Sequence, residues 1–249
     1  MSEELENISP LKALQAFTAA RIGMGHVGLS VPLKHSLEFK LAHANARDAV
    51  YSELNTEGLA AGLKQFNLPI LHLHSEAENR AKYLQRPDLG RKLNKASLDQ
   101  LTFYNDTDIV IIIADGLSAT AVNQNINGLL ALLIPKLLSV KLKLAPLCLV
   151  QQGRVAISDY IGYGLRAKLS LILIGERPGL SAADSMGAYL TYSPVPGLTD
   201  ESRNCISNIR PAGLNYYFAA DKIFYLIQEA FKRKLSGINL KDNAGLLDH

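Results

Sequence analysis

The sequence predicts an α/β fold, namely a Rossmann-like, mostly parallel sheet flanked by helices and preceded by a mainly helical N-terminal region. Three apolar runs carry this prediction: IVIIIAD at 109–115, LAPLCLV at 144–150 and LSLILIG at 169–175. Unbroken apolar strands that alternate with helical segments are typical of a parallel sheet covered on both faces. We place the mainly helical region at 1–95 and the Rossmann-like domain at 96–249.

The composition sets limits on the class of protein. Of the 249 residues, 48% are hydrophobic and 20% are charged, with a formal net charge of +3. This is ordinary for a soluble globular chain, and the charge is too small to indicate a nucleic-acid surface. No apolar run approaches the roughly 18 residues of a membrane-spanning helix, and the acidic start lacks the apolar part of a signal peptide. We therefore expect a cytoplasmic chain that binds neither nucleic acid nor membrane.

The N-terminal region is expected to hold two helices and a strand. A Ser-Pro pair at 9–10 is a typical helix start. A second helix should begin near Pro32, where leucines recur at four-residue steps, and reach about Leu54. The stretch LPILHLHSE at 68–76 alternates apolar residues with histidines, which predicts a short half-buried strand.

In the second region a helix follows each of the three apolar strands. The expected helices are 119–138, a short one in SDYIGYGL (158–165) capped by Ser158, and one in AADSMGAYLTY (182–192) that leads into a further strand. A last helix is expected at 215–234. Strands and helices in this alternation favour parallel pairing.

Polar side chains and glycines follow all three strands. The strand ends read DGLS at 115–118, QQGRV at 151–155 and GERPG at 175–179. The carboxyl ends of parallel strands form a common edge where ligands bind, so these loops predict a binding rim. Ordinary turns with a solvated Glu176–Arg177 pair remain the alternative. No dinucleotide fingerprint or P-loop follows a strand, which disfavours a nicotinamide or ATP site.

The histidines and cysteines do not indicate a metal centre. His72 and His74 could share one face of a strand, but no further ligand lies near them in sequence. Cys148 and Cys205 lack the spacing of a metal site or a disulfide framework. We assign no metal site and no catalytic residue to this chain.

A series of motifs adds a family resemblance to this pattern. The segments are TAARIGMGHVGLSVP (18–32), YLQRPDLGRKL (83–93), DGLSATAV (115–122), QGRVAISDYIG (152–162), IGERPGL (174–180), YSP (192–194), RNCISNIRPAGL (203–214) and SGINL (236–240). In order and approximate spacing they resemble the signature segments of the small, or light, subunit of ethanolamine ammonia-lyase. The resemblance covers the chain from about residue 10 to about residue 240.

The resemblance implies one subunit of an adenosylcobalamin-dependent lyase, which converts ethanolamine to acetaldehyde and ammonia by radical chemistry. In that family the enzyme is a hetero-oligomer: the large subunit is a barrel that holds the substrate, and the Rossmann-like domain of the small subunit covers the cobalamin. The cofactor supplies the difficult chemistry, so this chain is not expected to be active alone. The resemblance places the complex in the cytoplasm, either free or inside a bacterial microcompartment.

The family's cobalamin contacts, carried over by motif, fall on Val155, Glu176 and Cys205. On physical grounds we expect Glu176 to accept hydrogen bonds from side-chain amides of the corrin, and Val155 and Cys205 to offer apolar and backbone contacts. The segment 181–194 and His26 depart from the family pattern. The competing hypothesis is a stand-alone Rossmann-like protein that binds a phosphorylated metabolite.

Overall fold

The computed structural model describes residues 10–18, 20–101 and 107–241. Its core is a six-stranded sheet with the strand order β1-β3-β2-β4-β5-β6. The strands are β1 (Ile70–His74), β2 (Ile109–Ala114), β3 (Leu147–Gln151), β4 (Leu169–Gly175), β5 (Met186–Tyr192) and β6 (Asn204–Ile209). The first four strands in this order are mutually parallel, which confirms the predicted α/β class and the three apolar strands.

Strand β5 runs antiparallel to both of its neighbours, β4 and β6, so the sheet is mixed and less uniformly parallel than predicted. The reason is the short connection 176–185, since a parallel return would need a crossover of a dozen or more residues. A helix predicted at its end is absent. Instead Gly179 and Ala182 exchange two backbone hydrogen bonds, of 3.0 and 3.2 Å, and the chain turns directly into β5.

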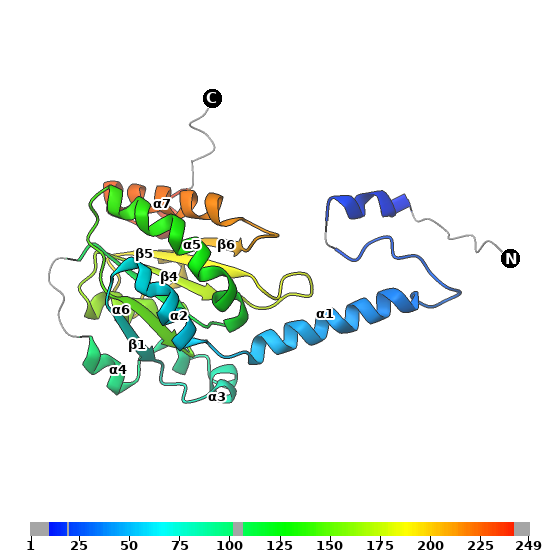
Figure 1. Ribbon diagram of the computed structural model, residues 1–249, viewed down its shortest axis with the longest axis horizontal. Helices are drawn as coiled ribbons and strands as arrows, with labels where there is room; N and C mark the ends of the chain where they lie inside the picture. The colour runs from blue at the N-terminus through cyan, green and yellow to red at the C-terminus, as the bar shows by residue number, and fades with distance from the viewer. Residues whose placement is uncertain (1–9, 19, 102–106, 242–249) are drawn as a thin grey trace, which may run out of the picture.

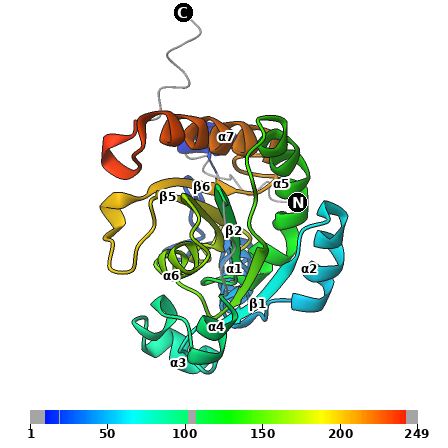
Figure 2. The same ribbon diagram turned by 90° about the vertical axis from the view of Figure 1, so that its left-hand side faces the viewer.

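Helices cover both faces of the sheet (Figure 2). Helices α2 (Thr56–Leu63), α5 (Ala119–Ser139) and α7 (Tyr216–Arg233) pack on one face, and α6 (Ile157–Gly164) packs on the other, with α3 (Arg80–Gln85) and α4 (Lys95–Gln100) beside it near β1. Alternate residues of β2 enter different cores: Ile111 and Ile113 face α5, whereas Val110 and Ile112 face α6. Burial on both faces explains why the strand sequence is apolar without interruption.

Two helix starts differ in detail from the prediction. The N-terminal segment Pro10–Ala16 forms a 3₁₀ helix instead of an α-helix. The short helix α6 begins at Ile157 with Ala156 at the N-cap, so Ser158 lies inside the first turn. Its hydroxyl donates to the carbonyl of Val155 at 2.8 Å and does not cap the helix.

Helix α1 (Leu33–Tyr51) begins beside Pro32 as predicted and extends away from the sheet, while the segment before it folds back above it (Figure 1). We call residues 10–18 and 20–51 the N-terminal arm. Of the described residues of α1, only Ala49 is buried. Among the described residues, no helix has the length and apolarity needed to cross a bilayer.

Candidate functional site

The loops after β2, β3 and β4 line an open cavity of about 440 Å³, which we call the rim cavity. Its lining consists of Tyr83, Gly116, Leu117, Arg154, Val155, Ile174, Gly175, Glu176, Arg177 and Tyr189. Strands β2 and β3 are neighbours, yet they lead to α5 and α6 on opposite faces. Such a switch point leaves a crevice at the carboxyl ends of the strands, where ligands bind in open α/β sheets.

Two glycines allow the loops after β2 and β4 to meet at the floor of the rim cavity. Gly116 has a φ of +57°, and the backbone N–H of Leu117 donates to the carbonyl of Gly175 at 2.9 Å. A Cβ on Gly175 would collide with the backbone carbonyl of Ser118. The buried strand β4 therefore ends in glycine because no side chain fits between these two loops.

Asp115 joins the loops after β2 and β3. Its carboxylate is buried and accepts hydrogen bonds from the backbone N–H groups of Gln152 at 2.8 Å and Gly153 at 3.0 Å, while Arg80 lies 3.9 Å away. Burial raises the pKa of Asp115 to about 6, although these N–H groups and the Arg80 charge oppose the rise. Its role in the folded chain is to fix the geometry of the rim.

Glu176 connects the end of β4 to β5 and β6. One carboxylate oxygen accepts a hydrogen bond from Ser207 Oγ at 2.5 Å, and the other accepts from Ser185 Oγ at 2.5 Å and the backbone N–H of Asn208 at 3.2 Å. A carboxylate has about four acceptor positions, so one remains for a ligand. These contacts hold the side chain in one orientation at the cavity wall.

Two arginines lie against one tyrosine at the other wall of the cavity. The guanidinium carbons of Arg80 and Arg154 are 4.7 and 4.2 Å from the ring centroid of Tyr83. The ring is fully buried, and its hydroxyl donates to the carbonyl of Gly153 at 3.1 Å. Cations over an aromatic face are attracted by its quadrupole, so the ring holds both guanidinium groups in place.

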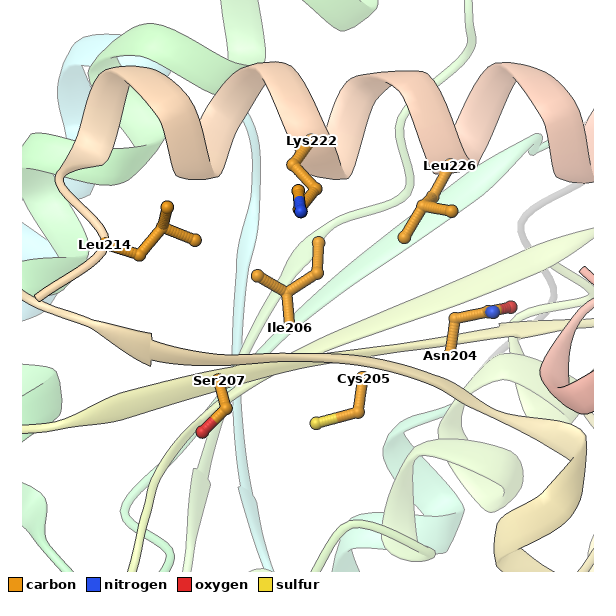
Figure 3. Close-up of a pocket in the computed structure, with 7 residues that line it drawn as sticks. All are labelled: Asn204, Cys205, Ile206, Ser207, Leu214, Lys222 and Leu226. Atoms are coloured by element: carbon orange, nitrogen blue, oxygen red, sulfur yellow. The ribbon is translucent and has the colours of Figure 1, made fainter. Parts of the chain in front are cut away.

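The structure brings two of the three expected site residues into the rim cavity and places the third at its margin. Val155 and Glu176 line the cavity together, from the loops after β3 and β4. Cys205 lies on the edge strand β6, opposite Tyr189 of the cavity wall. Figure 3 shows Cys205 and Ser207 on the face of β6 that points away from α7, whereas Ile206 points toward α7.

The surroundings of Cys205 disfavour its thiolate form. Partial burial of the sulfur raises the pKa of the thiol, and the negative charge of Glu176 adds to this rise. A hollow of about 230 Å³ runs along this strand and includes Lys222 of α7 (Figure 3). The environment suits a contact residue better than a nucleophile, since nucleophilic thiols have lowered pKa values.

Sequence reasoning missed the roles of Arg80 and Tyr83. Tyr83 begins the motif YLQRPDLGRKL, but nothing in that motif indicates that its ring supports Arg154, which is 71 positions away in the chain. Arg80 precedes the motif and carries no local signal. The ring of His74 contacts the backbone carbonyl of Ser75 at 2.8 Å, and no cluster of three metal-ligating side chains occurs in the part of the chain that the structure describes.

Comparison with known proteins identifies the family. Residues 8–241 match the family model of the ethanolamine ammonia-lyase light chain. A protein of Pseudomonas aeruginosa strain UCBPP-PA14, named ethanolamine ammonia-lyase small subunit, is 48% identical over 241 residues, covering 95% of this chain and 88% of the relative. Proteins of the same name from Pseudomonas putida and Azotobacter vinelandii are also 48% identical, with 95% of this chain and 89% of each relative covered. The chain therefore belongs to the family of ethanolamine ammonia-lyase light chains.

Proposed function

We propose that this chain is the small subunit of an adenosylcobalamin-dependent lyase that converts ethanolamine to acetaldehyde and ammonia, and that a large subunit holds the substrate. Family membership and the names of the relatives support this proposal. Bound cobalamin would supply the radical chemistry, and the residues of this chain would bind it and exclude water from one side. The complex would work in the bacterial cytoplasm, free or within a microcompartment.

The single observation that carries the proposal is that Val155 and Glu176, taken from separate motifs, line one cavity. The edge of a corrin carries many side-chain amides, which need both donors and acceptors. The rim cavity offers the guanidinium of Arg154 as a donor, the carboxylate of Glu176 as an acceptor and apolar surface at Val155 and Tyr189. These residues fit an edge rich in amides and apolar ring atoms.

The residues at the rim would have distinct roles. Glu176, fixed by its three hydrogen bonds, would use its remaining acceptor position for an amide N–H of the corrin. Val155 would pack against ring atoms. Cys205 would contact the ligand at the margin of the cavity, beyond Tyr189. None of the three would transfer a proton.

The size of the cavity supports a two-subunit arrangement. A volume of about 440 Å³ accommodates one edge of a cobalamin and not the whole molecule. A second protein must therefore cover the remainder if solvent is to be kept from the reactive side. This requirement agrees with the name small subunit that the relatives carry.

The N-terminal arm is the surface that we propose for docking the large subunit. Leu33, Leu37 and Leu41 lie on one face of α1 and are 74%, 55% and 63% exposed. An apolar stripe of this kind on a projecting helix is typical of a protein-protein interface. The tyrosine-rich region 189–217, of which Tyr189 lines the rim cavity, would extend this interface.

A stand-alone protein that binds a phosphorylated metabolite is the second candidate. Two arginines, Arg154 and Arg177, and one glutamate line the cavity, so its lining carries an excess positive charge that would attract an anion. A free-standing binding protein should retain its ligand when purified alone. A small subunit should retain cobalamin only with its large partner.

The test is acetaldehyde release from ethanolamine in the presence of adenosylcobalamin. The chain alone, the large subunit alone and the co-expressed pair are compared. We expect activity only from the pair, and weaker activity when the pair carries Glu176→Ala. A well-folded pair without activity would contradict the proposal.

A further inference from the structure

We propose that Arg154, held flat on Tyr83, binds the ligand of the rim cavity by donating a hydrogen bond to an acceptor oxygen at the ligand's edge. This inference rests on the proposed function, because it takes cobalamin as the ligand. Neither the family resemblance nor the motifs assign a role to Arg154 or Tyr83.

Arg154 is fixed from three sides. Its backbone N–H donates to the carbonyl of Gly90 at 2.7 Å, its guanidinium lies over the Tyr83 ring, and its Nη2 donates to the carbonyl of Tyr83 at 3.3 Å. Gly90 packs so closely that a Cβ there would come within 2.8 Å of the Cγ of Arg154 and 3.0 Å of the Tyr83 ring. A long side chain held in this way loses little further entropy when it binds a ligand.

The guanidinium has an unsatisfied donor. Among the described residues, the buried Nε of Arg154 has no hydrogen-bond partner. Buried polar groups in native proteins are almost always hydrogen-bonded, and leaving one unpaired is unfavourable. An acceptor supplied by a ligand, with a small rotation of the guanidinium, would remove this cost.

Among the described residues, no salt bridge joins Arg154 to a carboxylate. The carboxylate of Asp115 is engaged by two backbone N–H groups and by Arg80, and Glu176 is engaged by Ser185 and Ser207. Arg154 thus presents a positive charge beside Val155 at the cavity wall. A charge-assisted hydrogen bond to an oxygen is the interaction that this arrangement favours.

Two oxygens of a cobalamin could fill this role, namely a side-chain amide carbonyl of the corrin and the phosphodiester of the nucleotide tail. Both oxygens accept hydrogen bonds, so Arg154 could donate to either of them. Cobinamide keeps the corrin amides and lacks the nucleotide tail. Comparing the two ligands therefore identifies which oxygen Arg154 meets.

The experiment measures the dissociation constants of cyanocobalamin and dicyanocobinamide for the co-expressed pair by equilibrium dialysis. The variant is Arg154→Met, which keeps an unbranched stem against Gly90 and Tyr83 and removes every donor. The control is Arg233→Met, at an exposed arginine of α7 that pairs with Glu229 at 2.7 Å. Co-purification with the large subunit shows that each variant is folded.

We expect Arg154→Met to weaken cyanocobalamin binding by roughly ten- to a hundred-fold, the effect of losing one charge-assisted hydrogen bond, and Arg233→Met to leave it unchanged. A similar loss with dicyanocobinamide would indicate an amide carbonyl, and no loss with that ligand would indicate the phosphodiester. Equal cyanocobalamin binding by the parent pair and Arg154→Met would overturn the inference and leave the proposed function standing. A parent pair that binds no cobalamin would instead contradict the proposed function.

Discussion

Glu176 illustrates how one residue can serve both the fold and a site. It accepts hydrogen bonds from Ser185, Ser207 and the backbone N–H of Asn208, and these contacts hold β6 against the end of β4. A ligand can reach only the acceptor position that remains. The network explains why an acidic residue is placed directly after a buried strand.

Glu176→Gln should therefore be more disruptive than its small change in shape suggests. The new amide N–H₂ would face donors where the carboxylate now accepts, and we expect a loss of about 1–3 kcal/mol in the free energy of unfolding. Thermal unfolding of the full chain measures this change. Ser185→Ala, which removes one donor and leaves the other two contacts, is the control and should cost less. Equal stability of Glu176→Gln and the parent chain would contradict this role.

The raised pKa of Asp115 predicts a specific dependence of stability on pH. Its pKa is about 6 in the folded chain, above the value of about 3.9 expected in an unfolded chain. The folded state therefore binds the proton more tightly, and this group's contribution to the free energy of unfolding is full below about pH 4 and lost as pH rises through about 6. The loss amounts to at most about 3 kcal/mol.

Urea unfolding at several pH values between 4 and 7 tests this prediction. The stability difference between the parent chain and Asp115→Asn should fall across that range and level off above it, because the variant lacks the titrating group. A difference that does not change with pH would show that Asp115 has an ordinary pKa in the folded state.

Part of the candidate site could be located residue by residue from the sequence. The rule that ligands bind beyond the carboxyl ends of parallel strands places Glu176 and Val155 on one rim, and the structure brings both into one cavity. The support of Arg154 by Tyr83 could not be predicted. It depends on contacts between residues 71 positions apart, for which the sequence carries no periodic signal.

At the scale of elements, the close approach of the loops after β2 and β4 is the most constrained feature of the rim. Gly175→Ala would drive a Cβ into the backbone carbonyl of Ser118, so we expect a loss of about 1–3 kcal/mol or more in the free energy of unfolding. Gly179→Ala is a matched control in the same loop, where the nearest atom to a Cβ would be the carbonyl oxygen of Ala182 at 3.9 Å. Urea unfolding should separate the two variants, and equal effects would contradict this account of Gly175.

The elements that could be predicted are those with long, uniform patterns. The apolar runs of β2, β3 and β4 and the leucine-rich helix α5 were recognisable because burial on one or both sides shapes every residue. The turn at 179–182 and the direction of β5 could not be recognised from the sequence. A short loop with Ser, Ala and Asp is compatible with a helix start as well as with a turn. Tertiary pairing with β4 decides the outcome.

For the whole molecule, a helix-covered sheet contrasts with a projecting arm, and this arm is the surface that we propose for a partner subunit (Figure 1). The proposed division near residue 95 remains a prediction, and β1 of the first part joins the sheet by pairing with β3. The apolar spacing on α1 was visible in the sequence. The exposure of this face of α1 was not visible in the sequence, because periodicity shows that a helix face is apolar but does not show what covers it.

The double change Leu37→Glu and Leu41→Glu tests the arm. Both side chains are exposed, so the isolated chain should fold unchanged, whereas the large subunit should lose most of its co-purification with this chain. Gln65→Glu, at an exposed position on the body, adds one negative charge where the double change adds two, and it should have no effect. Retention of the large subunit by the double variant would exclude this face of α1 as the docking surface.

We propose that cobalamin meets this chain at the rim cavity. The decisive measurement is the dissociation constant of adenosylcobalamin for the co-expressed pair with Val155→Trp, which fills the cavity, against Val140→Trp. Val140 is exposed and follows α5 at the end of that helix farthest from the rim. We expect Val155→Trp to weaken binding at least about ten-fold, which corresponds to roughly 1.4 kcal/mol, and Val140→Trp to leave it unchanged. Unchanged binding in Val155→Trp would contradict the proposal.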